Sequence, residues 1–326
     1  MRRREFITLL GGTATWPSAA KAQSSITPVI GVLYSGRPTG YWLRPDAALR
    51  RGLNDAGYTE GRNLRIEARW AEDHYDRLPD MAADLVQQKV AVIAAVTTTS
   101  ARAVKAATDK IPVVFITIAD PVQIGFVGSL SRPGGNMTGV TMLSVEVGSK
   151  RLELLHEAVP SATTIALLLN PKNPNATTEA KETQAAAHRL GLTLPVLYAS
   201  TEVEFDATFA KLRELRANAL TIGQDGFFNN QMSRLAALSV ANAIPAIYSN
   251  RDFTVAGGLI SYGANELDLY RQAGVYVGRI LKGDKPADLP VVQASKFEMC
   301  INLKTAKKLG LTISADVLSI ADEVIE

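Results

Sequence analysis

The chain has very little of the side-chain chemistry that disulfides, thiol enzymes and zinc sites require. Cys300 is the only cysteine, so no disulfide can form within the chain. Its apolar neighbours favour a small buried residue over a reactive thiol. The three histidines, His74, His156 and His188, lie far apart in the sequence, whereas a zinc site needs clustered ligands.

Several motifs of nucleotide-dependent and hydrolytic enzymes are also missing. The sequence contains no convincing Walker A loop, glycine-rich dinucleotide loop or nucleophile elbow. An enzyme would need a nucleophile–base pair or a metal centre, and scattered histidines provide neither. We therefore expect no catalytic residues, no metal and no cofactor, and a protein that is not an enzyme.

The excess of positive charge is confined to the N-terminus. The whole chain has 35 Lys and Arg residues against 32 Asp and Glu residues. Residues 1–22 hold four of the basic residues and a single acidic one, so the remainder is balanced. Because no basic or aromatic stripe appears later, nucleic acid is not expected as a partner.

The first 22 residues have the order of an export signal. A basic start is followed by the short, weakly apolar stretch Ile7–Ala14 and by the small-x-small site Ala20-Lys21-Ala22. The run Arg3-Arg4-Glu5-Phe6-Ile7 is typical of a twin-arginine signal, and an ordinary export signal is the alternative. We expect cleavage after about Ala22 and a periplasmic protein. The apolar stretch is too short to span a bilayer, so no membrane anchor is expected in the mature form.

Apolar runs alternate with helical patterns along the rest of the chain. Runs rich in Val, Ile and Leu occupy residues 29–34, 90–96, 113–118, 165–169, 219–222 and 246–248. They show no alternation, which is typical of parallel strands covered on both faces. Residues 64–70 do alternate and indicate a strand nearer an edge. Between the runs, apolar residues recur at helical spacing, as at Leu267, Tyr270 and Gly274, and the aromatic residues in these stripes are interpreted as core. The pattern predicts an α/β fold of doubly wound layers.

The strands are too numerous for one sheet of ordinary size, so two lobes are expected. The turn Pro133-Gly134-Gly135 interrupts the order, and a new series of strands and helices begins at Ile165. We therefore place the first lobe up to about residue 140 and the second from about 141. A second interruption follows at residues 255–258.

Ligands of open α/β sheets bind outside the carboxyl ends of the strands, so the loops that follow the apolar runs are the candidate site. These loops carry hydrogen-bonding side chains, with aromatic residues nearby. The candidate ligand-binding residues are Ser35, Gly36, Tyr41, Trp42, Thr97, Thr98, Thr99, Ser100, Ala119, Asp120, Asn170, Asn173, Gly223, Gln224, Asp225, Tyr248, Ser249 and Asn250.

The sharpest element is the run Thr97–Ser100 between a buried strand and a helix. Backbone N–H groups at a helix N-terminus, together with hydroxyls, suit a carboxylate. The alternative is a simple helix cap, which needs only one such residue. Asp120 and Asp225 could each receive a ligand ammonium, but a turn for Asp120 and a helix cap for Asp225 are equally open.

Five segments, in their order and spacing, resemble one protein family: residues 118–122 (IADPV), 125–130 (GFVGSL), 133–140 (PGGNMTGV), 169–171 (LNP) and 301–311 (INLKTAKKLGL). It is the ABC transporter substrate-binding family that includes tryptophan- and tyrosine-type binding proteins. The resemblance implies a type I periplasmic-binding-protein architecture: two Rossmann-like lobes, three hinge crossings and closure around a ligand. It assigns residues 28–140 and 256–285 to the first lobe and residues 141–255 and 286–326 to the second. It also implies an ABC permease and ATPase as partners.

The function predicted from these features is capture of an amino acid or a similar small polar molecule between the lobes, for an ABC importer. Thr97–Ser100 would hold a carboxylate, Asp120 or Asp225 an ammonium, and Asn170, Asn173 and Asn250 would engage on closure. A protein that presents its ligand to a sensor is the alternative, as is a sugar, nucleoside or organic acid as ligand. A monomer is expected, since the protein must open and close freely.

Overall fold

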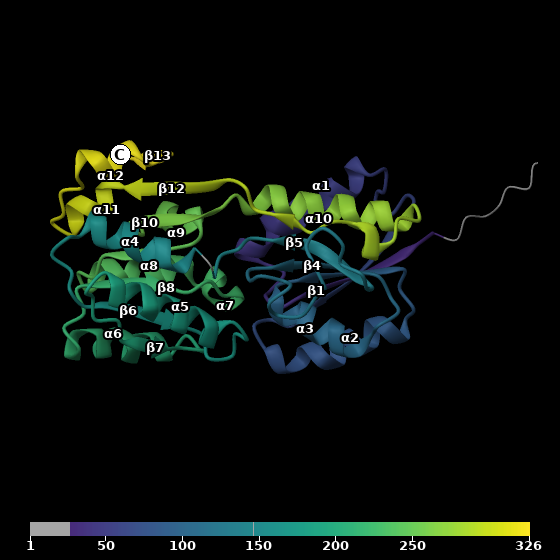
Figure 1. Cartoon of the computed structure of the whole chain (residues 1–326), viewed down its shortest axis with the longest axis horizontal. Helices are drawn as coiled ribbons and strands as arrows, with labels where there is room; N and C mark the ends of the chain where they lie inside the picture. The colour runs from purple at the N-terminus through teal and green to yellow at the C-terminus, as the bar shows by residue number, and fades with distance from the viewer. Residues whose placement is uncertain (1–26, 146) are drawn as a thin grey trace, which may run out of the picture.

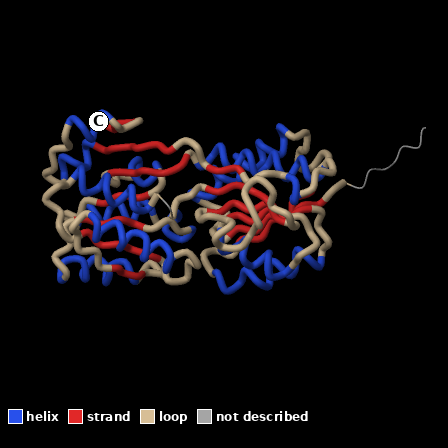
Figure 2. The backbone as a smooth tube through the Cα atoms, viewed as in Figure 1, coloured by secondary structure: helices blue, strands red, loops and turns tan. Residues whose placement is uncertain are grey.

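The computed structural model describes residues 27–145 and 147–326, and the predicted signal peptide lies outside them. The chain forms two α/β lobes that lie side by side along the long axis of the molecule (Figure 1). Each lobe has a central sheet between helices (Figure 2). The two-lobed α/β architecture predicted from the sequence is therefore confirmed.

The first lobe is built on a six-stranded parallel sheet in the order β11-β5-β4-β3-β1-β2. Its strands are β1 (Val29–Tyr34), β2 (Arg65–Trp70), β3 (Val92–Val96), β4 (Val113–Thr117), β5 (Met137–Thr141) and β11 (Val292–Gln293). Its helices are η1 (Gly40–Trp42), α1 (Leu43–Asp55), η2 (Tyr75–Arg77), α2 (Leu78–Gln87), α3 (Thr98–Ala107), α10 (Glu266–Leu281) and η3 (Pro286–Asp288). β2 is an edge strand, as its alternating sequence indicates.

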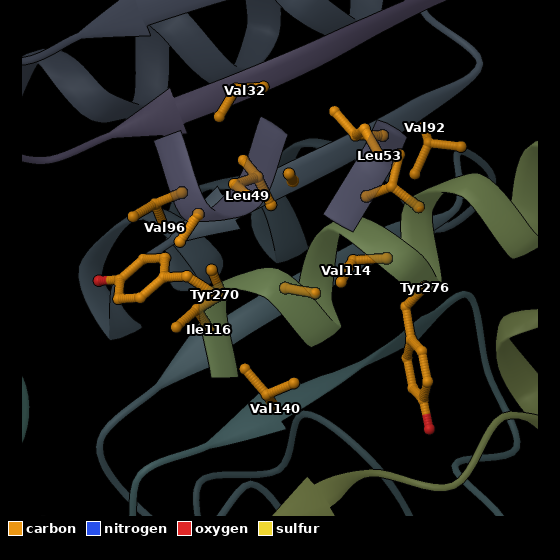
Figure 3. Close-up of a cluster of buried hydrophobic side chains, with 14 of the residues drawn as sticks. Val32, Leu49, Leu53, Val92, Val96, Val114, Ile116, Val140, Tyr270 and Tyr276 are labelled. Carbon is orange, nitrogen blue, oxygen red and sulfur yellow. The ribbon is translucent and has the colours of Figure 1, made fainter. Parts of the chain in front are cut away.

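Helices cover both faces of this sheet, which explains the unbroken apolar runs. Val32 points to a core shared with α1 and α10, whereas the next residue, Leu33, points to a core shared with α2 and α3. Figure 3 shows the first of these cores, in which Leu49 of α1 and Tyr270 of α10 pack with strand residues such as Val96. Successive strand residues are thus buried on opposite faces.

The second lobe has a seven-stranded sheet in the order β13-β12-β10-β9-β8-β6-β7, in which β12 is antiparallel to β10. Its strands are β6 (Ile165–Leu169), β7 (Val196–Tyr198), β8 (Ala219–Ile222), β9 (Ala246–Tyr248), β10 (Ile260–Ala264), β12 (Phe297–Asn302) and β13 (Glu323–Ile325). Its helices are α4 (Gly148–Ala158), α5 (Ala176–Arg189), α6 (Glu204–Glu214), α7 (Gly226–Asn230), α8 (Met232–Ala241), α9 (Arg251–Val255), α11 (Leu303–Lys308) and α12 (Ala315–Ser319).

The chain crosses between the lobes three times: after β5, between β10 and α10, and between β11 and β12. Two predicted boundaries differ from this arrangement. β10, within the segment 256–264 assigned to the first lobe, pairs with β9 and β12 of the second. β11, within the segment 286–293 assigned to the second lobe, pairs with β5 of the first. A strand next to a crossing can extend either sheet, so its sequence does not reveal which sheet it joins.

Both lobes repeat one strand order. The first runs β2-β1-β3-β4-β5 and the second β7-β6-β8-β9-β10. In doubly wound sheets of this order, the loops beyond the carboxyl ends of the strands form the ligand site at the point where the order reverses. Here the loops that follow β1, β3 and β4 meet loops of the second lobe.

Candidate functional site

A cavity lies between the two lobes. It is partly open to solvent and has a free volume of about 30 Å³. The first lobe contributes Trp42, Thr97, Thr98, Thr99, Ile116, Ile118, Met142 and Tyr270, and the second lobe contributes Asn173, Gln224, Asp225, Gly226 and Asn229. The two walls differ in chemistry: the first is largely apolar apart from the threonines, and the second is polar.

The threonines stand at the N-terminus of α3. Thr97 is the N-cap, and its Oγ1 accepts a hydrogen bond from the backbone N–H of Ser100 at 3.3 Å. Its φ of 107° is unusual for a β-branched residue and indicates local strain. The Thr98 hydroxyl is 2.8 Å from that of Thr117 and faces the fold. The backbone N–H groups of Thr98 and Thr99 begin the helix, where no intrahelical acceptor is available.

Two aromatic side chains belong to the apolar wall. Trp42 and Tyr270 are both buried, and Met142 and Ile118 complete the surface beside them. The indole Nε1 of Trp42 is buried without a hydrogen-bond partner. This wall therefore suits an apolar or aromatic part of a ligand.

Asp225 is the centre of the second-lobe wall. It is buried, and its carboxylate accepts from Asn170 Nδ2 at 2.8 Å, from Asn173 Nδ2 at 3.1 Å and from the Phe227 N–H at 3.0 Å. The hydroxyl of Tyr75, from the first lobe, lies 3.1 Å from each of its oxygens.

Asp225 has donors around it but no cation. Among the described residues, no Lys, Arg or His side chain pairs with it. Burial raises the pKa of Asp225 above its ordinary value, and the hydrogen bonds from Asn170, Phe227 and Tyr75 act in the opposite direction. A buried carboxylate with donors but no counter-ion is suited to a cationic group supplied by a ligand.

Glu266 forms a second cluster at the hinge, beside the cavity. This first residue of α10 accepts hydrogen bonds from Tyr41, from Gln224 Nε2 at 2.8 Å and from Asn250 Nδ2 at 3.1 Å. Burial raises the pKa of Glu266 to about 7 against the effect of the hydrogen bonds from Tyr41 and Gln224. Gln224 thus connects the cavity wall to the hinge.

The lobes also meet at two further places. Asn230 Nδ2 donates to Asp73 at 2.9 Å, and Asp73 also pairs with Arg37 at 2.8 Å. Near the hinge, Arg44 pairs with Asp252 at 2.7 Å. With the Tyr75–Asp225 contact, these bonds join the first lobe to the second in a closed arrangement.

The structure brings part of the predicted site together. The predicted residues that line the cavity are Trp42, Thr97, Thr98, Thr99, Asn173, Gln224 and Asp225. Others support that wall or the hinge: Asn170 and Tyr248 bond to Asp225, Tyr41 and Asn250 bond to Glu266, and Ser35 lies against Gly226.

The remaining predicted residues lie behind the cavity or in a turn. Ser100 is bound within the cap of α3, and the Ala119 carbonyl accepts a hydrogen bond from Thr141. Gly36 packs on the indole of Trp42, and Gly223 packs on Leu169 and Glu179. Ser249 lies against Gly263. Asp120 Oδ1 accepts from the backbone N–H groups of Val122 at 2.7 Å and Gln123 at 3.2 Å, which is the turn that the sequence left open. Asp225 does cap α7, its other alternative, and it also lines the cavity.

Sequence reasoning missed several residues of this region. Tyr75 follows β2, and the loop rule applied to the other strands would have found it. Tyr270 was interpreted as core because it lies in an apolar helical stripe, and it serves the core and the cavity at once. Glu266 carried no sequence signal, since an acidic residue in the first turn of a helix is common.

In residues 27–145 and 147–326, no three His, Cys, Asp or Glu side chains gather in a way that could hold a metal ion. Among the helices of the same residues, none is long and apolar enough to cross a membrane.

The chain is similar to several known proteins. It is 29% identical over 268 residues to a tyrosine-binding protein of Clostridioides difficile (strain R20291), covering 82% of this chain and 76% of that protein. An ABC domain solved in complex with L-Trp from Streptococcus pneumonia is 27% identical with a TM-score of 0.83, over 92% of this chain and 100% of that one. A conserved domain protein from Vibrio cholerae is 25% identical with a TM-score of 0.85, over 91% and 99%. The family model of ABC transporter substrate binding proteins matches residues 46–325, and the chain therefore belongs to this family.

Proposed function

We propose that this protein captures a free amino acid in the interlobe cavity as the extracytoplasmic binding component of an ABC importer. The observation that carries the proposal is the pairing of opposite poles: the N-terminus of α3 on one wall and Asp225, buried without a cation among the described residues, on the other. An amino acid carries a carboxylate and an ammonium that match these two poles.

The carboxylate is assigned to the α3 pole. A helix N-terminus favours negative charge through its unpaired N–H groups and its dipole. Because the Thr97 hydroxyl already satisfies the Ser100 N–H, the N–H groups of Thr98 and Thr99 are the donors left for a ligand. The Thr99 hydroxyl lies 2.8 Å from that of Thr97, and either hydroxyl can be the donor of this bond.

The ammonium is assigned to Asp225. The donors that surround this carboxylate hold it in place and favour its ionised form against the effect of burial. A ligand cation would complete the pairing that a buried charge requires. Asp120, held in a turn, is not given this role.

The side chain of the ligand is assigned to the apolar wall. Trp42, Tyr270, Met142 and the isoleucines at 116 and 118 provide aromatic and aliphatic surface but few polar groups. An amino acid with an apolar or aromatic side chain fits this wall best. The similarity to a tyrosine-binding protein and to a protein solved with L-Trp supports the same class.

Export and transport complete the proposal. The basic, apolar and small-x-small order of residues 1–22 supports export through a cleavable signal of twin-arginine type. Membership of an ABC transporter substrate-binding family supports delivery of the ligand to a permease and its ATPase, and a role in binding rather than catalysis. We further propose a monomeric, periplasmic protein.

A thermal-shift screen of protein that has been unfolded and refolded, to remove any ligand that co-purifies, tests this function. We expect stabilisation by one or more L-amino acids with apolar or aromatic side chains, by RT ln(1 + [L]/Kd) in the free energy of unfolding. The N-acetyl and amide derivatives of the same amino acid should give little stabilisation. Stabilisation by a sugar or nucleoside, without any amino acid, would contradict the proposal.

A further inference from the structure

Tyr75 reaches from the first lobe into the polar wall of the second. It begins η2, shortly after β2 ends at Trp70. Its hydroxyl lies 3.1 Å from both carboxylate oxygens of Asp225 and accepts a hydrogen bond from the Phe227 N–H at 3.1 Å. Among the described residues, no other first-lobe side chain hydrogen-bonds to Asp225.

The donor and the acceptor in the contact between Tyr75 and Asp225 can be assigned. A phenol has one proton to donate and oxygen lone pairs to accept with. Since the N–H of Phe227 can only donate, the Tyr75 oxygen accepts there, and its proton is directed to the carboxylate. Burial and the neighbouring charge of Asp225 raise the pKa of Tyr75 well above its ordinary value, so the phenol keeps this proton.

The same loop holds the other end of the short helix α7. Asp73 accepts from Asn230 at 2.9 Å and 3.2 Å, while Tyr75 binds at Asp225. Between these two points lies Gly226, where a Cβ atom would be only 2.8 Å from Ser35 Oγ and 3.2 Å from the Tyr75 hydroxyl. The first lobe therefore forms hydrogen bonds at both ends of α7 and lies close to the helix backbone between them.

The carboxylate of Asp225 has two roles, one in the cavity and one in the contact between the lobes. In the closed arrangement, Asp225 lines the cavity and also accepts the interlobe hydrogen bond from Tyr75. A cation bound at Asp225 favours its ionised form, and the ionised form is the stronger acceptor for a phenol. Ligand binding and closure should therefore strengthen each other.

We propose that Tyr75 is a positioning residue that couples occupancy of Asp225 to closure of the lobes. This inference rests on the proposed function, in which Asp225 receives the ligand cation. Ligand held by one lobe becomes trapped when Tyr75 reaches Asp225, so the hydroxyl acts mainly on the rate of ligand escape. Removal of this one oxygen leaves the cavity walls intact.

The test compares Y75F with wild type, and Y198F serves as the matched control because Tyr198 is exposed on β7 of the second lobe. The probe is the amino acid that stabilises the wild type most in the thermal screen, with kon and koff measured by stopped-flow fluorescence. We expect Y75F to bind about tenfold more weakly, through koff with kon nearly unchanged. The ligand-free melting temperature should stay close to that of the wild type, and Y198F should match the wild type throughout.

A double-mutant cycle with D225N separates coupling from a general loss of packing. In the D225N background the charged acceptor is absent, so Y75F should add less than about twofold to the loss of affinity. Binding by the wild type together with an unchanged koff in Y75F, or full additivity with D225N, would overturn the coupling alone. Absence of amino-acid binding to the wild type would overturn the proposed function, and with it the premise of the coupling.

Discussion

The amide nitrogen of Gln224 lies 2.8 Å from a carboxylate oxygen of Glu266, which joins a cavity-lining loop of the second lobe to the first residue of α10. Because a carboxylate can only accept, the Gln224 amide must turn its nitrogen toward Glu266. α10 itself packs in the core of the first lobe beside α1. A single carboxylate at the hinge thus binds side chains of both lobes.

Ligand affinity should depend on pH through Glu266. Burial in the closed arrangement raises its pKa to about 7, and in an open arrangement solvent would return the pKa toward 4.5. A group with the higher pKa in the closed form takes up a proton on closure. Closure is therefore favoured below pH 7 and loses this contribution as the pH rises through 7, so we expect calorimetric affinity to be about tenfold weaker at pH 8 than at pH 6. Burial raises the pKa of Asp73 to about 6, so Asp73 acts in the same direction.

Variants at the hinge test whether Glu266 causes the pH dependence of the affinity. The groups around Glu266 are Tyr41, Arg44, Tyr248, Arg251, Asp252, Tyr270 and Glu298. E266Q should bind at pH 8 about as tightly as at pH 6 apart from the smaller effect of Asp73. Glu298 lines a cleft together with Glu266, and E298Q should behave as wild type. A wild-type pH profile in E266Q would refute the role of Glu266.

Asp225 and Asp120 should respond differently to the same change. D225N removes the buried charge that we assign to the ligand ammonium, and we expect a loss of at least about 2 kcal/mol of binding free energy. D120N keeps the oxygen that accepts from Val122 and Gln123, and it should bind like the wild type. Titration calorimetry with one amino acid decides between the two residues, and a larger loss in D120N would reverse the assignment.

A side chain at position 226 should keep the lobes apart. In the closed arrangement, the Cβ of a residue replacing Gly226 would lie 2.8 Å from Ser35 Oγ and 3.4 Å from the Trp42 ring. We expect G226V to show a larger radius of gyration in small-angle X-ray scattering with ligand present, and affinity at least about tenfold weaker. G135A is the control, because nothing lies within 4 Å of a Cβ there. Normal closure in G226V would show that the two lobes do not meet at this point.

Stability should depend on the buried pair Arg151–Glu179, whose side chains are 3.3 Å apart and almost fully buried. Burial raises the pKa of Glu179 to about 7, and Arg151 lowers it. Because R151M would leave the carboxyl without its charged partner, we expect it to cost about 3–5 kcal/mol in urea unfolding. The double variant R151M/E179M should recover part of this loss. A cost below about 1 kcal/mol in R151M would show that the pair is dispensable.

The fold could be predicted from sequence because burial on both faces leaves a strong local signal. The run 29–34 needs no partner to be recognised as a strand of a covered sheet. Strands β10 and β11 were assigned to the wrong lobes, since their membership depends on pairing with residues far away in the chain.

The site was most predictable where residues closely follow a strand, as Thr97 follows β3 and Gln224 lies two residues beyond β8. Asp120 and Asp225 both follow strands and have the same chemistry. Only tertiary structure separates them, because one folds back onto its own turn and the other is held at the cavity by Asn170 and Tyr75. Glu266 and Tyr270 lie on a helix that packs on the first lobe but begins at the hinge, and no local pattern encodes that position.

A crystal structure of the protein with the amino acid that binds it most tightly tests the central claim most directly. We predict that the ligand carboxylate accepts hydrogen bonds from the N–H groups of Thr98 and Thr99, and that its ammonium donates to Asp225. A ligand bound outside this cavity, or one whose cationic group does not reach Asp225, would contradict the account.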